Sequence, residues 1–366
     1  MGILSCNAPY NEGGLGKHLA QLVEEARSGK TLDGYYTSRK KSNDPKGHEI
    51  SLKRFRWLFH SLPFRDSLSW RDFLAADLFD RAVARMLAAS AIFHGFSGKS
   101  KHSFISARKL GYQQLILESA TSHISNVMAQ HQRAAKAFPI EKGWLNKQQH
   151  KKTLQEYDTA DLIYVASEYS RQTFLKAGFP ESKVRRRVLL IEPRFAPPAR
   201  RFDSDHFTIV YVGRLQVSKG LPVLLDAFKQ IQDKDAQLIL VGGYGSNGME
   251  SYLNRRIEAD PRIKILPGDP LPRLHRADVL VHPSFEDGLG LGPLEALACG
   301  VPVIVTEDTG MKEYVVDDVN GYVLPTGNVG ALVEQLRASR LRPLKGNFAP
   351  APPACSSPTV KWGSQV

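Results

Sequence analysis

Short apolar runs alternate with longer amphipathic stretches along most of the chain, and the alternation is most regular in the second half. Strands are predicted there at 207–212, 237–241, 263–266, 279–282, 301–305 and 321–324. Helices are predicted at 221–231, near 249–258, at 291–299 and at 329–336. Strands joined through helices pair in parallel, so this half predicts a doubly wound α/β sheet.

The first half repeats the pattern less regularly. Strands are predicted at 3–6, 91–94, 113–118 and 161–166, and helices at 15–27 and 168–177. We therefore expect an α/β protein with two Rossmann-like, doubly wound domains. Two such domains facing each other would form an interdomain cleft at the carboxyl ends of their strands, where open α/β sheets bind ligands.

Proline-rich segments mark the expected domain boundaries. The sequence PRFAPPARRF at 193–202 cannot continue a helix or a central strand. We expect an N-terminal domain at 1–192, a linker at 193–206 and a C-terminal domain at 207–341. Residues 342–366 include a part with four prolines and almost no apolar periodicity, which predicts a disordered tail.

The composition is that of a globular protein, with 42% hydrophobic and 23% charged residues. No run approaches the ~18 apolar residues of a membrane-spanning helix, and the N-terminus does not have the pattern of a signal peptide. Cys6, Cys299 and Cys355 lie far apart and form no CxxC pair. A disulfide framework or a zinc site is therefore not expected, and a cytoplasmic location fits best.

The net charge of +12 is distributed unevenly. Residues 1–200 contain 32 Lys and Arg against 18 Asp and Glu, which gives +14, whereas residues 201–366 contain 17 against 19, which gives −2. A basic half fits a nucleic acid, an anionic membrane or a phosphorylated substrate. The two halves are therefore expected to have different partners.

Basic and aromatic residues are interleaved at 39–71, where Phe55, Trp57, Phe59 and Phe64 lie among lysines and arginines. This combination fits an interfacial membrane segment, and it also fits single-stranded nucleic acid. A solvated loop over the first domain explains it equally well.

The sequence GRLQVSKG at 213–220 follows a predicted strand and precedes a helix. Arg214 offers a planar fork of donors and Lys219 a compact ammonium, and together they suit a diphosphate. Taken alone, the same two residues also fit solvated cations at a surface turn.

A second loop, SFEDGLGLGPLEALACG at 284–300, also lies between a predicted strand and a helix. The glycines let the backbone approach a ligand, and the amides of Leu289, Gly290 and Leu291 would form an anion site at the helix start. Asp287 and Glu295 are eight residues apart, and carboxylates accept hydrogen bonds from sugar hydroxyls. The alternative is a glycine-rich turn followed by an ordinary helix.

These two loops together resemble the nucleotide-sugar-dependent retaining glycosyltransferases of family four, which have the GT-B fold. The resemblance spans about residues 10–338 and is densest at 207–325. It implies that Arg214 and Lys219 hold the donor diphosphate, that Asp287 meets the transferred sugar and that Glu295 meets the ribose. It also implies that the loop of Gly288, Leu289, Gly290 and Leu291 binds the donor. Asp287 is one carbon shorter than the usual Glu of the family, which leaves the choice of sugar open.

The first half matches this family more weakly. The sequence NEGGLGKHL at 11–19 resembles the family's glycine loop, which implies donor binding by Gly14, Leu15 and Gly16. His123 resembles the histidine at the family's reaction centre, although a surface or core histidine is the alternative. His94 also ends a strand, and for it a structural role is favoured.

No metal-ligand cluster is apparent in the sequence. The Asp-x-Asp matches at 203–205 and 233–235 precede strands, whereas metal-dependent glycosyltransferases carry theirs at a strand end. We therefore expect no metal and no other cofactor, with the leaving diphosphate stabilised by Arg214, Lys219 and a helix N-terminus. The resemblance implies retention of configuration through same-face attack, assisted by the donor phosphate.

The combined expectation is a cytoplasmic retaining hexosyl- or glycosyltransferase that acts in polysaccharide biosynthesis. It would move a sugar from a nucleotide-sugar donor to a glycan or lipid-linked acceptor. The basic half fits peripheral binding at the inner face of an anionic membrane, and no nucleic acid is expected because no known binding module is present. The alternative is a non-catalytic sugar-nucleotide-binding or scaffolding protein with an incomplete C-terminus, because the crossing helices of the family are not found after Arg337.

Overall fold

A computed structural model describes residues 1–52, 68–141, 143, 145–199 and 206–344. The chain divides into two compact units. Among the described residues, the first contains 1–128 and 145–190, and the second contains 129–143 and 191–344. In the sequence, the strands of the first sheet thus precede the expected linker at 193–206, and the strands of the second sheet follow it.

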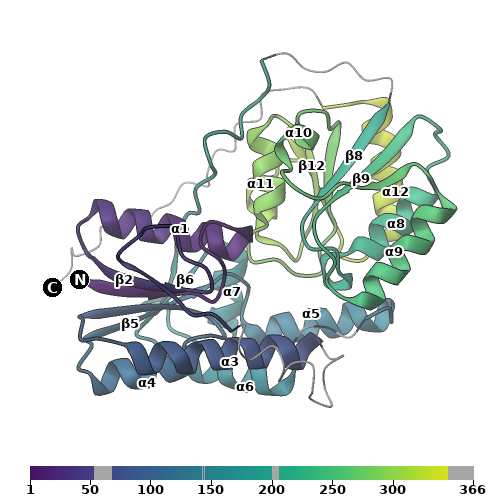
Figure 1. Ribbon diagram of the computed structural model, residues 1–366. Helices are drawn as coiled ribbons and strands as arrows, with labels where there is room; N and C mark the ends of the chain where they lie inside the picture. Colours follow the sequence, from purple (N-terminus) through teal and green to yellow (C-terminus); the bar gives the residue numbers. More distant parts are fainter. Residues whose placement is uncertain (53–67, 142, 144, 200–205, 345–366) are drawn as a thin grey trace. The chain divides into compact units, whose positions relative to one another are not determined.

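The first unit is built on seven parallel strands in the order β3-β2-β1-β4-β5-β6-β7. These are β1 (Gly2–Ser5), β2 (Leu32–Thr37), β3 (Gly47–Glu49), β4 (Ile92–Phe96), β5 (Gln114–Ser119), β6 (Leu162–Val165) and β7 (Val184–Arg186). Its helices are α1 (Gly13–Ser28), α3 (Leu68–Met86), α4 (Lys101–Lys109), the start of α5 (Ile124–Ala137), α6 (Lys147–Thr159) and α7 (Glu168–Lys176). Figure 1 shows α1 on one face of this sheet and α3, α4 and α6 on the other.

The second unit is built on six parallel strands in the order β10-β9-β8-β11-β12-β13. These are β8 (Phe207–Val212), β9 (Ala236–Val241), β10 (Ile263–Ile265), β11 (Val279–His282), β12 (Val303–Thr306) and β13 (Gly321–Leu324). Its helical elements are η2 (Val217–Lys219), α8 (Leu221–Lys229), α9 (Asn247–Ala259), α10 (Leu271–Leu274), α11 (Leu291–Ala298), η3 (Gly310–Tyr314) and α12 (Val329–Leu341).

Both sheets are doubly wound. In the second, the chain runs outward from β8 to β10, returns to β11 beside β8 and then runs outward the other way. The apolar faces of β8 and β9 and of helices α8 and α12 meet in one buried core, which includes Ile209, Tyr211, Leu224, Leu238 and Leu336. The prediction of two Rossmann-like domains is confirmed, whereas the cleft expected between them stays a prediction.

Several features of the sequence analysis lie outside the described residues. They are the aromatic residues Phe55, Trp57, Phe59 and Phe64, the Asp-x-Asp match at 203–205 and the segment 345–366. Among the described residues, no helix combines the length and apolar character needed to cross a membrane.

Candidate active site

The candidate site lies in the second unit, at the point where its strand order reverses. The loop 213–220 follows β8 and the loop 283–290 follows β11, and these two strands are neighbours. In a doubly wound sheet, the carboxyl ends of two such strands open a crevice in which ligands bind. The two sequence motifs with the most specific chemistry therefore meet at the expected position.

The loops pack directly against each other, which explains the glycine at the end of the first. Gly220 has a φ of 72°, and a Cβ at this position would lie 1.8 Å from the carbonyl oxygen of Pro283. The amide of Phe285 also donates to the carbonyl of Ser218, at 2.9 Å. Any side chain at 220 would separate the loops, so the glycine keeps Lys219 beside the second loop.

Lys219 and Asp287 form the centre of the site. The Lys219 ammonium donates to Asp287 Oδ2 at 2.7 Å and to the Glu286 carbonyl at 3.1 Å. His282, the last residue of β11, lies 3.1 Å from the same carboxylate oxygen through Nε2. Burial alone would raise the pKa of Asp287, but the Lys219 charge and the His282 hydrogen bond lower it well below its usual range. The carboxylate is therefore ionised and fixed in orientation.

Arg214 differs from Lys219 in that its side chain is exposed. Its guanidinium takes part in no ion pair with the residues that the structure describes. Its backbone is fixed, because the buried Tyr211 hydroxyl donates to the Arg214 carbonyl at 2.8 Å. An exposed guanidinium on an anchored backbone can bind an anion from solvent without first breaking an internal pair.

The second loop ends at the N-terminus of α11. Gly290 precedes this helix with a φ of 93°, and the amides of the first turn have no partner within the helix. Glu295 lies one turn into α11 and is buried, at 6% exposure. The structure thus places Lys219, Asp287, Gly288, Leu289, Gly290, Leu291 and Glu295 in one region of the second unit. Leu289 is buried, so its side chain is not available to a ligand from solvent.

The other three donor-binding candidates lie in the first unit. Gly14, Leu15 and Gly16 form the first turn of α1, which begins at Gly13 rather than near residue 15. A Cβ on Gly16 would lie 2.0 Å from the Pro9 carbonyl, so this glycine permits close packing of the preceding loop. Donor binding by this turn stays a prediction.

His123 lies at the start of α5 in an aromatic cluster. Its ring centroid is 5.1 Å from that of Phe174 and 5.2 Å from that of Tyr157. Burial, with a smaller contribution from His150, lowers the pKa of His123 to about 4. The residue as a whole is 5% exposed, an environment that fits a core residue. Its assignment to the reaction centre stays a prediction.

We expect the His123 environment to make stability depend on pH. The unfolded imidazole binds a proton near pH 6.5 and the folded one near pH 4, so the unfolded state binds more protons between these values. The stability contributed by the neutral His123 ring is therefore fully present above about pH 6.5 and is lost as the pH falls toward 4. Urea unfolding from pH 8 to pH 4 should show a shallower decline for His123→Phe than for the wild type. Parallel curves for the two proteins would contradict this account.

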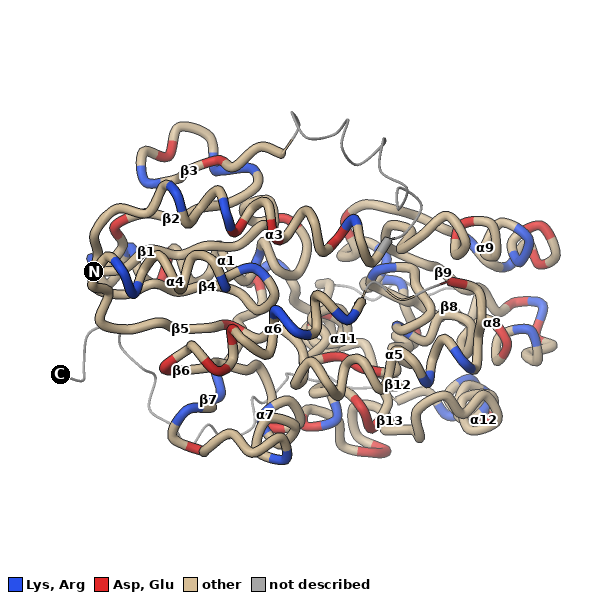
Figure 2. The backbone as a smooth tube through the Cα atoms, turned by 90° about the horizontal axis from the view of Figure 1, so that it is seen from below, with Lys and Arg blue, Asp and Glu red and all other residues tan. Residues whose placement is uncertain are grey.

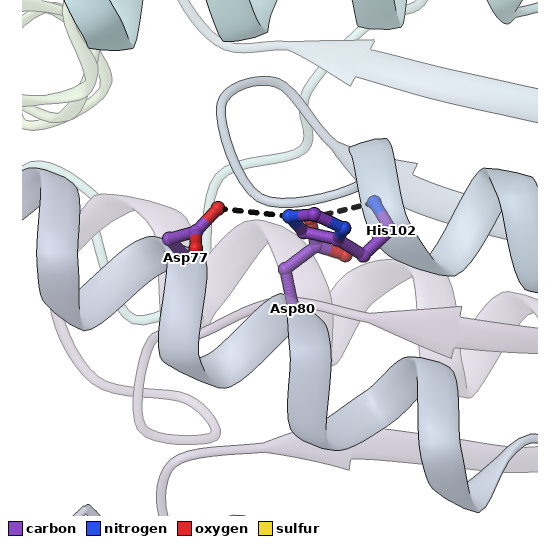
Figure 3. Close-up of side chains that lie close together, drawn as sticks. All are labelled: Asp77, Asp80 and His102. Atoms are coloured by element: carbon purple, nitrogen blue, oxygen red, sulfur yellow. Dashed lines mark hydrogen bonds and ion pairs between the residues drawn. The ribbon is translucent and has the colours of Figure 1, made fainter.

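Asp77, Asp80 and His102 lie close together between α3 and α4 (Figure 3) and offer metal-ligating atoms. However, the Lys152 ammonium lies 3.0 Å from Asp77 and 2.9 Å from Asp80. Asp80 also accepts hydrogen bonds from the amides of His102 and Ser103, at 2.9 Å each, and so caps α4. These contacts explain the cluster as a helix cap neutralised by a lysine.

A buried polar cluster of the first unit was missed by the sequence analysis. Glu118, at the end of β5, lies 2.8 Å from His94, 3.4 Å from His18 and 3.1 Å from Arg187. Burial would raise the pKa of Glu118, but Arg187 and the two histidines lower it well below its usual range. The one signal in the sequence was a carboxylate at the end of an otherwise apolar strand. For His94, the structural role favoured from the sequence fits this buried pairing.

Comparisons with known proteins agree with these observations. Residues 194–339 match the family described as "Glycosyl transferases group 1". A D-inositol 3-phosphate glycosyltransferase of Salinispora tropica is 31% identical over 171 residues, which cover 38% of this chain and 36% of that protein. The capsular polysaccharide biosynthesis glycosyltransferase CapM of Staphylococcus aureus is 30% identical over 138 residues, which cover 36% of each chain. The chain thus spans about a third of the length of these curated relatives.

Solved structures show the same fold over nearly the whole chain. A sucrose-phosphate synthase from Thermosynechococcus elongatus has a TM-score of 0.74 and 19% identity, covering 95% of this chain and 91% of that one. Anabaena Alr3699/HepE in complex with UDP-glucose has a TM-score of 0.65 and 16% identity, covering 93% and 90%. Residues 194–339 are thus a group 1 glycosyltransferase domain, and the whole chain has the two-domain GT-B fold.

Proposed function

We propose that the protein transfers a sugar from a nucleotide-sugar donor to an acceptor, and that the donor binds at the carboxyl ends of β8 and β11. The observation that carries this proposal is the meeting of Lys219, Asp287 and the N-terminus of α11 at the strand-order reversal of the second sheet. Cations and helix amides suit a diphosphate, and fixed carboxylates suit sugar hydroxyls.

The chemistry assigned to each residue follows from its surroundings. When the bond between sugar and diphosphate breaks, negative charge grows on the leaving diphosphate, and Arg214, Lys219 and the first-turn amides of α11 would stabilise it. Asp287 is fixed by Lys219 and His282 through Oδ2, so its other carboxylate oxygen is the one we assign to a sugar hydroxyl. Glu295 would accept hydrogen bonds from the ribose.

We also propose that the anomeric configuration is retained. Retention through same-face attack needs an acceptor hydroxyl that approaches beside the leaving phosphate, with a phosphate oxygen taking its proton. The bond from the anomeric carbon to the phosphate oxygen breaks as the bond to the acceptor oxygen forms. The released nucleoside diphosphate then carries the proton and the electron pair.

Metal independence is a further part of the proposal. Positive charge at the diphosphate would come from Arg214 and Lys219 rather than from a divalent cation. We expect excess EDTA to leave the initial rate of donor turnover almost unchanged. A rate that is lost on chelation and restored by Mn²⁺ or Mg²⁺ would contradict this mechanism.

For the acceptor, we propose a glycan or a lipid-linked glycan presented at an anionic membrane surface. Residues 1–200 carry a net charge of +14, and Figure 2 shows basic positions along β7 and α6 of the first unit. Each basic residue near an anionic bilayer contributes about 1 kcal/mol. Several such residues acting together would give reversible surface binding.

We therefore expect the protein to sediment with anionic liposomes but not with neutral ones. High salt should weaken the binding, because charges are screened within about 10 Å at 0.1 M ionic strength. Equal binding to neutral vesicles, or no binding to anionic ones, would contradict membrane binding. It would favour the alternative that the segment 39–71 and the basic half are solvated.

Calorimetric titration with nucleotides tests donor binding directly. The panel pairs each nucleoside diphosphate with its monophosphate: UDP with UMP, GDP with GMP and ADP with AMP. We expect one diphosphate to bind clearly more tightly than its monophosphate, because Arg214 and Lys219 contact the second phosphate. A chain that binds none of them, or binds both members of each pair equally, would contradict the proposed site. The scaffold alternative predicts binding without turnover.

A further inference from the structure

The segment Ala129–Gly143 packs within the second unit, although the chain before and after it belongs to the first. It contains the last part of α5 and the residues that follow. Arg133 donates to the Thr326 carbonyl, after β13, at 2.8 Å, and lies 3.5 Å from Asp308, after β12. These contacts place the start of the segment on loops at the carboxyl edge of the second sheet.

The segment continues along this edge toward the candidate site. The ring of Phe138 packs against that of Phe285, in the loop after β11, with centroids 6.5 Å apart. Ala134 is 1% exposed within the core cluster of the second unit. Burial, together with the Lys219 charge, lowers the pKa of His131 to about 4, so this ring is neutral at pH 7. The segment is therefore an integral part of the packing around the loops that hold Lys219 and Asp287.

Glu141, near the end of the segment, accepts two hydrogen bonds from the second unit. Its Oε1 accepts from the backbone amide of Val217 at 2.7 Å. Its Oε2 accepts from the Ser246 hydroxyl, and Ser246 in turn caps α9 by accepting from the Met249 amide at 3.1 Å. One carboxylate therefore joins the loop after β8 to the loop after β9.

The first of these bonds lies within the motif that carries the two cations. Val217 is the first residue of η2, three residues after Arg214 and two before Lys219. The first amides of a helical turn have no partner within it, and a carboxylate there forms a strong charge-assisted bond. Without Glu141 the Val217 amide would lose this partner, and the backbone that sets the position of Lys219 would be less constrained. A displacement of about 1 Å at such a group is costly in rate.

We propose that Glu141 is a positioning residue for diphosphate binding: it holds the loop 213–220 in the conformation in which Arg214 and Lys219 contact the second phosphate. This inference rests on the proposed function. It assigns a role in donor recognition to a residue that is 76 positions from its partner in the sequence and outside the donor motifs.

Four variants of the full chain separate this role from simple structural support. Glu141→Ala removes both hydrogen bonds, whereas Glu141→Gln retains an acceptor for Val217 and a donor for Ser246. Val217→Pro removes the amide and keeps Glu141. It suits the backbone, because proline is tolerated at the first helical position and Gln216 has the extended conformation (φ −153°, ψ 160°) that precedes proline. Ser246→Ala removes the other bond and the cap of α9. The control is Lys136→Ala, an exposed position in the same segment.

The measurement is the ratio of diphosphate to monophosphate affinity for the pair that the wild type binds, with the melting temperature of each variant. We expect Glu141→Ala and Val217→Pro to lower this ratio about 10-fold, because only the contacts with the second phosphate depend on the position of the loop. Glu141→Gln should stay within about threefold of the wild type. Ser246→Ala should lower the melting temperature but keep the ratio, and Lys136→Ala should change neither.

The outcomes distinguish the inference from the function on which it rests. If the wild type prefers the diphosphate and both Glu141→Ala and Val217→Pro keep that preference, the positioning role is wrong and the donor site stands. If the melting temperature falls while the ratio is unchanged, Glu141 supports only the fold. A wild type with no preference for the diphosphate would overturn the donor site itself, and the role of Glu141 with it.

Discussion

Replacing Lys219 with alanine is expected to lower the rate of sugar transfer by about 10²- to 10³-fold, the usual effect of losing one group that stabilises developing negative charge. Lys219 also neutralises the Asp287 carboxylate at 2.7 Å, so its loss should raise the pKa of Asp287 toward the ordinary range. Steady-state rates with the donor, and melting temperatures measured beside them, separate the effect on transfer from any effect on folding.

The companion variant Arg214→Ala should lower the rate by a similar factor and leave the melting temperature unchanged, because its side chain is exposed. Lys229→Ala, at the exposed end of α8, is the matched control and should behave as the wild type. Turnover near the wild-type rate in both Lys219→Ala and Arg214→Ala would show that the diphosphate is held elsewhere.

The second large effect is expected for Glu295→Gln. A hydrogen bond to a charged group contributes about 1.5–3 kcal/mol, so losing the carboxylate should weaken the donor and the free nucleoside diphosphate alike, by about 10- to 100-fold. The amide has nearly the same volume as the carboxyl, so the buried position on α11 should stay packed. Calorimetric affinities for both ligands measure this directly.

Glu334→Gln is the control for Glu295→Gln, because it removes the same charge from an exposed position on α12. If Glu295 binds the ribose, Glu295→Gln should lower the affinities for the donor and for the free nucleotide by the same factor. A Glu295→Gln protein that binds nucleotide normally but fails to transfer would instead place this carboxylate at the reacting sugar.

The second sheet could be predicted closely from the sequence because its strands are short, apolar and bounded by turn residues. Strands β8, β11 and β13 have the predicted bounds, and the site loops follow β8 and β11. The alternation of strands and helices places both loops at the carboxyl edge of a parallel sheet, but it does not give the strand order. The sequence therefore predicted the edge of the sheet on which Lys219 and Asp287 lie, and the pairing of β8 with β11 brings the two residues together.

Helix α6 was not predicted, because its buried face is not apolar. Helix α6 reads KQQHKKTLQEYDT, and its buried side chains include Gln149, Lys152 and Glu156. These side chains are satisfied by partners in other segments, such as Asp80 for Lys152 and the amide of Ser100 for Glu156. Periodicity of apolar residues cannot reveal such a helix, since its stability depends on contacts that are distant in the sequence.

Glu141 was missed for the same reason. Nothing near it in the sequence points to the donor, and its role depends on two hydrogen bonds to loops that follow β8 and β9. The grouping of Ala129–Gly143 with the second unit was likewise not anticipated, since the predicted boundary lay after residue 192. Tertiary packing, rather than a local motif, brings this segment to the site.

The most direct test of the central claim is donor turnover by the wild type beside the double variant Arg214→Ala/Lys219→Ala. Each protein is incubated with a panel of nucleotide sugars, and the released nucleoside diphosphate is quantified by mass spectrometry. We predict that the wild type turns over at least one donor and that the double variant loses this activity while remaining folded, as a cooperative thermal unfolding transition would show. Turnover at equal rates by both proteins, or turnover of none of the donors by the wild type, would contradict this claim.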